Sequence, residues 1–167
     1  MKPFDLISKY FWVVAVIVTM INLLIFRKRA QKHIQDNPHL EEGYASLFRG
    51  YLLWMNIPWV VMGIGCTFGE VPSVWHYFRP RDGNPYVLAW FVSIFFLWIL
   101  GTFWLFFRDG AETLVRHPGA LEFRYGLKNK DITNPVLIKA FWLLALAGGV
   151  VGVVLMWSIE IPIPIFR

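Results

Sequence analysis

Residues 86–107 read YVLAWFVSIFFLWILGTFWLFF and contain no charged side chain. A helix rises about 1.5 Å per residue, so about 20 apolar residues cross the ~30 Å hydrocarbon core of a bilayer. This stretch has 22 residues and therefore predicts a transmembrane helix. The whole chain agrees, because 57% of its residues are hydrophobic and 16% are charged. In soluble domains the charged share is about a quarter.

Three further charge-free stretches reach or approach the same length, at residues 10–26, 50–69 and 140–159. We therefore expect an all-α fold, a polytopic membrane protein in which residues 1–167 form a single integral membrane domain. Its architecture would be a four-transmembrane-helix bundle. The connecting segments have at most 32 residues, which is too short for a separate folded unit. This excludes a soluble enzyme, a nucleic-acid-binding protein and a receptor with a folded head.

Basic residues gather at one set of span ends, and this predicts the orientation. Four topology anchors each stand at the end of a different span: Arg27, Arg49, Arg108 and Lys139. The loops 27–49 and 108–139 carry eleven of the 16 Lys and Arg residues, so the positive-inside rule places them in the cytoplasm and both termini on the opposite side. Lys2 and Lys9 argue for the reverse. The expected location is a bacterial inner membrane or a thylakoid-type membrane.

The loops contain signals for helix starts and extensions. Asn-Pro occurs at residues 37–38, 84–85 and 134–135, and each pair predicts a helix start, because Asn is a favourable N-cap and Pro suits the first helical position. Residues 27–35 contain no helix breaker, so the first helix is expected to extend into the cytoplasm and the second to begin there, near Pro38. At 121–128, apolar and charged residues alternate. We interpret this segment as part of an interfacial loop between the third and fourth spans, with disorder as the alternative.

Small residues recur at helical spacing in two spans. The predicted helix-packing residues are Ala145, Gly148, Gly149 and Gly152 in the fourth span and Gly65 and Gly69 in the second. The first four stand at positions i, i+3, i+4 and i+7, on one face of a helix. Such stripes let two helix backbones approach closely. The partner helix belongs either to this chain or to another subunit.

Polar groups inside the spans are few. Pro58 cannot donate a hydrogen bond to the carbonyl of Trp54, so it predicts a kink in the second helix. Asn56 could satisfy that carbonyl, bond to another helix or contact a ligand. Lys139 stands about one turn into the fourth helix, where its ammonium group either reaches the lipid headgroups or joins a buried ion pair.

Aromatic residues exceed what interfacial belts require. Rings all around the third span predict contact with lipid, with another protein or with a flat apolar cofactor such as a quinone or a pigment. Outside the spans, the candidates for partner contact are Trp75, His76, Tyr77 and Phe78, together with Ile161, Ile163, Ile165 and Phe166 near the C-terminus. An apolar extended tail is unfavourable in water, so we expect it to pack against the protein, the bilayer or a partner.

The spans carry no acid or histidine at mid-depth, and the single cysteine, Cys66, has no second thiol. We therefore predict no catalytic set, no metal site and no required cofactor, with bound lipid expected. The favoured interpretation is a non-catalytic accessory, assembly or scaffold subunit of a larger membrane complex or a homo-oligomer. Its partners would be membrane lipid and other membrane-protein subunits or further copies of the chain, and no nucleic acid.

Two alternatives belong to other functional classes. A small transporter or channel for a polar solute or ion would need intramembrane polar residues to converge on one path, namely Asn22, Asn56, Thr67 and Ser93. A lipid- or prenyl-acting enzyme at the cytoplasmic interface would use Arg108, Asp109, Glu112 and His117.

Overall fold

A computed structural model describes residues 3–69, 71–125 and 128–159 of the chain. Its four long helices are α2 (Phe11–Asp36), α3 (Glu41–Phe68), α4 (Pro85–Phe107) and α6 (Pro135–Ser158). Each is long and apolar enough to cross a membrane. The prediction of four helices with the length and composition of membrane spans is confirmed.

Short elements connect the long helices. They are α1 (Pro3–Lys9), the 3-10 helices η1 (Pro38–Leu40), η2 (Val74–Phe78) and η3 (Pro80–Asp82), the helix α5 (Gly110–Arg116) and the strands β1 (Glu122–Tyr125) and β2 (Lys128–Asp131). The two strands pair antiparallel, with Glu122 opposite Asp131. Strands at this place were not predicted from the sequence. The alternation of apolar and charged residues there has the period of two that is typical of a strand.

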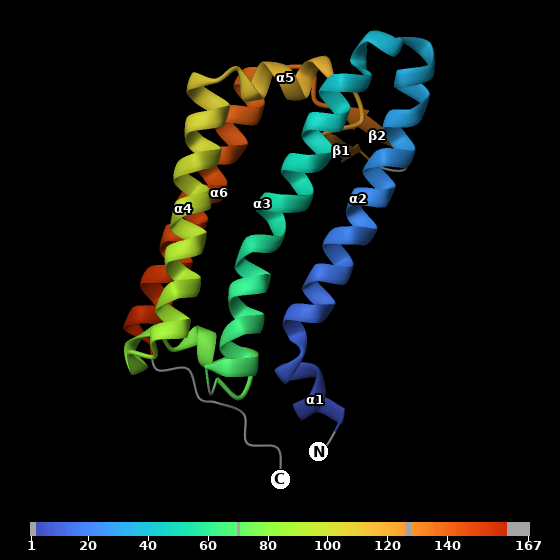
Figure 1. The fold of residues 1–167 in the computed structure, drawn as a ribbon. Helices are drawn as coiled ribbons and strands as arrows, with labels where there is room; N and C mark the ends of the chain where they lie inside the picture. The colour runs from blue at the N-terminus through green and yellow to red at the C-terminus, as the bar shows by residue number, and fades with distance from the viewer. Residues whose placement is uncertain (1–2, 70, 126–127, 160–167) are drawn as a thin grey trace.

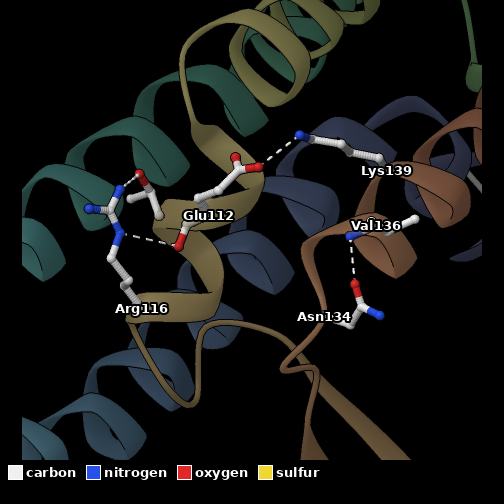
Figure 2. Close-up of polar contacts among 6 residues, drawn as sticks. Glu112, Arg116, Asn134, Val136 and Lys139 are labelled. Atoms are coloured by element: carbon white, nitrogen blue, oxygen red, sulfur yellow. Dashed lines mark hydrogen bonds and ion pairs between the residues drawn. The ribbon is translucent and has the colours of Figure 1, made fainter.

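Two of the three Asn-Pro pairs act as predicted. The Oδ1 atom of Asn84 accepts hydrogen bonds from the backbone N–H groups at the start of α4, including that of Tyr86 at 2.9 Å. Asn134 accepts from the N–H of Val136 at 2.9 Å, as Figure 2 shows. Asn37 makes no such bond and is followed by η1 instead of directly by an α-helix.

The four long helices alternate in direction (Figure 1). Helix α2 packs against α3, α3 against α4, and α4 against α6. The ends of α2 and α4 and the starts of α3 and α6 therefore lie at one end of the bundle, together with α5 and the hairpin. We call this the loop end. Of the four topology anchors, Arg108 and Lys139 lie at the ends of α4 and α6, whereas Arg27 and Arg49 lie about two turns inside α2 and α3.

Helices α2 and α3 extend beyond the charge-free stretches that predicted them. Helix α2 continues without a break to Asp36, and α3 starts at Glu41 and passes through Pro58 to Phe68. The extra turns of both helices lie at the loop end, above the other two helices in Figure 1. Helix α5 packs on α4 and α6, and the extra turns of α3 meet His117, the residue that follows α5.

The buried side chains gather near the two ends of the bundle. At the end opposite the loop end, one cluster consists of Met62, Cys66, Val71, Tyr77, Val87 and Phe91. At the loop end, a smaller cluster joins Leu105, Ala111 and Ile138. Ile138 is the one buried residue of α6. Helix α6 therefore has the least protein cover of the four long helices, and most of its apolar side chains are exposed.

Candidate functional site

The junction between α5 and α6 at the loop end is held by an ion pair. Nζ of Lys139 lies 2.8 Å from Oε1 of Glu112, as drawn in Figure 2. The same ammonium group is 5.9 Å from the centre of the Phe106 ring. The hydrogen bond from Lys139 holds the pKa of Glu112 below its ordinary value of 4.5. Of the two roles predicted for Lys139, the structure therefore shows an ion pair, although a partly exposed one.

The other end of α5 is fixed against α3 through a histidine. Nδ1 of His117 lies 2.6 Å from the carbonyl oxygen of Thr113, and its ring meets the Tyr44 ring edge-on at 4.9 Å between centres. The His117 ring also rests on Gly43, where a Cβ atom would overlap Nε2. The hydroxyl of Tyr44 donates to the carbonyl of Pro118 at 2.6 Å. A glycine is needed at position 43 because the imidazole occupies the space of a side chain.

The hairpin is connected both to α2 and to the turn after α5. Arg29 of α2 forms an ion pair with Glu122 at 3.1 Å. The carboxylate of Asp131 accepts a hydrogen bond from the backbone N–H of Gly119 at 2.6 Å. Segment 108–134 thus ties the α2–α3 pair to the α4–α6 pair.

This arrangement directs the residues that were predicted for a lipid- or prenyl-acting enzyme to different partners. Glu112 is directed to Lys139, whereas His117 is buried against Gly43 and Tyr44. Asp109 lies at the N-terminal boundary of α5 with a φ of 52°. Among the described residues, no group of three His, Cys, Asp or Glu side chains is placed to hold a metal ion.

The aromatic segment at the opposite end packs on this chain. Trp75, His76, Tyr77 and Phe78 all fall on η2. Tyr77 is buried, and its hydroxyl donates to the carbonyl of Met62 at 3.1 Å. Burial raises the pKa of the Tyr77 phenol, and the nearby Cys66 adds to the shift.

The neighbours of Tyr77 on η2 also have internal contacts. Trp75 stacks on Phe4 with 6.4 Å between ring centres, and Nδ1 of His76 lies 3.2 Å from the Ser73 hydroxyl. The proposed partner contacts Ile161, Ile163, Ile165 and Phe166 lie outside the described residues.

The predicted packing glycines divide into two groups. Gly65 lies against the hydroxyl of Tyr77, Gly69 against the ring of Tyr86, and Gly149 against the ring of Trp98. A Cβ atom on Gly148 or Gly152, by contrast, would meet no described atom within 4 Å. Ala145 is likewise exposed. Gly65, Gly69 and Gly149 therefore make room for aromatic rings of this chain. Ala145, Gly148 and Gly152 lie on a helix face that no described residue covers.

The polar residues within the spans bond mainly to their own helices. Nδ2 of Asn56 donates to the carbonyl of Leu52 at 2.7 Å, which is not the Trp54 carbonyl freed by Pro58. The hydroxyl of Ser93 donates to the carbonyl of Trp90 at 2.7 Å.

The polar residues of the predicted transport path differ in their exposure to the surroundings of the chain. Ser93 is buried, whereas Asn22 and Thr67 are exposed on the outer surface. The described structure therefore gives the four polar residues no shared environment of the kind that a transport path needs.

One interhelical hydrogen bond was not anticipated. Nε1 of Trp142 on α6 donates to the hydroxyl of Thr102 on α4 at 2.9 Å, while that hydroxyl donates to the carbonyl of Trp98 at 2.7 Å. The indole reaches this position because Gly101 has no side chain in its way. A glycine next to a threonine in an aromatic span is the signal in the sequence that could have suggested this contact.

No protein-family model, curated protein or solved structure matches this chain.

Proposed function

We propose that the chain is a non-catalytic integral membrane protein that acts as an accessory or scaffold subunit, with α6 as its main contact surface. The observation that carries this proposal is a strip of exposed or half-exposed residues along one side of α6. We call it the α6 strip, and it consists of Phe141, Leu144, Ala145, Gly148, Val151, Gly152 and Leu155.

The α6 strip has the composition of a helix-packing surface. Its members are spaced by three or four residues, so they share a face. Gly148 and Gly152 form a shallow floor, and Phe141, Leu144, Val151 and Leu155 stand beside it as larger apolar side chains. Two helices that meet at such a floor gain van der Waals contact that lipid chains provide less well. Within this chain the floor has no occupant among the described residues.

The contacts elsewhere in the chain support a structural role. Glu112 and Lys139 form an ion pair, and His117 at the end of α5 packs on Gly43 of α3. Within the spans, the Asn56 amide group and the Ser93 hydroxyl donate to nearby backbone carbonyls, and the Thr102 hydroxyl accepts from Trp142. Glu112 and His117 of the enzyme alternative and Ser93 of the transport path are thus engaged in contacts that stabilise the fold.

The proposal is tested by placing larger side chains on the floor of the α6 strip. The full chain is expressed in the cells in which it occurs and is extracted from their membranes. Gly148→Leu and Gly152→Leu should convert the assembly that is extracted in mild detergent into the monomer, measured as native mass. Ala147→Leu is the matched control, because Ala147 is also a small exposed residue of α6 but lies off the strip. A wild-type chain that is extracted as a monodisperse monomer without any other subunit would refute the proposal.

A further inference from the structure

An open hollow of about 430 Å³ lies at the loop end, between the start of α3 and the end of α5. The polar residues that line it are His39, Glu42, Ser46, Thr113, Arg116 and His117. We call it the α3–α5 hollow. No part of the proposed subunit role uses it, because it lies at the end of the helices and not along the α6 strip.

The α3–α5 hollow carries two opposite charges that do not pair with each other. The guanidinium group of Arg116 makes two long hydrogen bonds, from Nε to the carbonyl of Glu112 and from Nη2 to the hydroxyl of Thr113, each at 3.4 Å. Figure 2 shows its remaining nitrogen pointing away from both. Within the described part of the chain, neither Arg116 nor Glu42 has an ion-pair partner. A cation and a carboxylate therefore face the same open space.

The position of the α3–α5 hollow is at the boundary of the charge-free spans. Ser46 lies one helical turn before Gly50, where the second charge-free stretch begins, and α5 starts three residues after the end of α4. In Figure 1, α5 crosses the bundle at that level. Beyond Ser46, α3 exposes apolar side chains such as Leu53, and Phe107 is exposed at the end of α4, which precedes α5. A molecule in the hollow could therefore place a polar group between the charges and acyl chains along the helices.

We propose that the α3–α5 hollow binds the headgroup of an ethanolamine phospholipid. Its phosphate would accept hydrogen bonds from Arg116, whose planar group suits phosphate oxygens, and from the hydroxyl of Thr113 or Ser46. Its primary ammonium group would donate to the carboxylate of Glu42. A glycerol headgroup has the phosphate but leaves the carboxylate unpaired, and a choline headgroup has the charge but no N–H donor. The pairing of Arg116 with Glu42 thus selects for the ethanolamine headgroup.

The test uses the full chain reconstituted in vesicles of equimolar phosphatidylethanolamine, phosphatidylglycerol and phosphatidylcholine. Lipids that stay bound after gentle extraction are counted by native mass spectrometry. We expect phosphatidylethanolamine to be enriched, and Glu42→Gln and Arg116→Gln each to reduce the enrichment about threefold, as befits one exposed charge contact. Glu42→Gln should also shift the preference toward phosphatidylglycerol, because the repelling carboxylate is gone.

Matched controls separate this site from general charge effects. Glu41→Gln and Arg49→Gln remove the same charges from exposed positions that do not line the hollow, and both should retain the wild-type enrichment. Equal retention of all three lipids, or equal losses in the controls, would overturn the proposal. So would soluble O-phosphoethanolamine that displaces the lipid at the same concentration, since the ligand would then be a free solute. None of these readings depends on whether the chain assembles through the α6 strip.

Discussion

Gly148 and Gly149 are neighbours on α6, and the structure predicts that the same substitution has opposite effects on them. A Cβ atom on Gly149 would lie 2.6 Å from Cζ2 and 2.7 Å from Cη2 of Trp98, closer than carbon atoms tolerate. The Trp98 ring has little freedom to withdraw, because it also packs edge-to-face on Phe95 with 5.4 Å between centres. A Cβ atom on Gly148 would meet nothing within 4 Å.

The magnitude follows from two opposing contributions. Replacing Gly by Ala inside a helix stabilises it by roughly 0.5–1 kcal/mol, because Gly loses more backbone freedom on folding. This contribution is the same at both positions and cancels in their comparison. Overpacking costs about 1–3 kcal/mol and arises only at Gly149. Gly149→Ala should therefore be less stable than Gly148→Ala by about 1–3 kcal/mol, which is a factor of about 5 to 150 in the unfolding equilibrium.

The assay is reversible unfolding of the purified full chain in mixed micelles, with increasing denaturing detergent, followed by tryptophan fluorescence. Gly148→Ala is the matched control, and a second variant, Gly149→Ala with Trp98→Leu, should recover part of the loss. Equal stability of the two single variants, or greater stability of Gly149→Ala, would show that Trp98 does not pack on Gly149 as described.

Three further predictions concern the loop end. Gly43→Ala should destabilise the chain by about 1–3 kcal/mol through overlap with the imidazole of His117, and adding His117→Ala should relieve part of it; an unchanged thermal unfolding midpoint would contradict this contact. Tyr44→Phe removes the hydrogen bond to Pro118 and should cost about 1 kcal/mol in the same measurement, with no loss arguing against that bond. Glu112→Gln should be less stable than wild type at pH 7, where the carboxylate with its lowered pKa is ionised and paired with its lysine partner on α6. The gap should close as the pH falls below 4.5 and the carboxylate takes up a proton, so a gap that persists at low pH would refute the ion pair.

The four long helices could be predicted because their cause is local. A charge-free run of about 20 residues has one stable arrangement in a bilayer, in which each backbone polar group bonds within its own helix. The N-caps Asn84 and Asn134 were predictable for the same reason, since cap and capped groups are two or three residues apart. Asn37 shows the limit, because its backbone is extended as in an N-cap but its side chain makes no cap hydrogen bond.

The division of the glycines could not be predicted, because it depends on how each helix is rotated against its neighbour. In the sequence, Gly148 and Gly149 belong to one stripe. In the structure, Trp98 on α4 packs on Gly149 and not on Gly148. This contact joins residues that are far apart in the chain. Lys139 and Glu112 show the same limit. They are 27 residues apart, and their pairing required the position of α5, which no local pattern defines.

Helix α6 is attached to the rest of the chain by a small number of specific contacts, and this makes it the element on which assembly would act. Lipid tails are as apolar as leucine side chains, so burial of apolar surface contributes little to holding helices together in a membrane. The specific contacts of α6 include the Glu112 to Lys139 ion pair at the loop end, the Trp142 to Thr102 hydrogen bond, and the fit of Trp98 on Gly149. All three lie toward α4 and α5, whereas Gly148 and Gly152 remain open. A partner on the α6 strip would therefore add contact without breaking any of these interactions, which is why the open face favours a docking surface over a defect in packing.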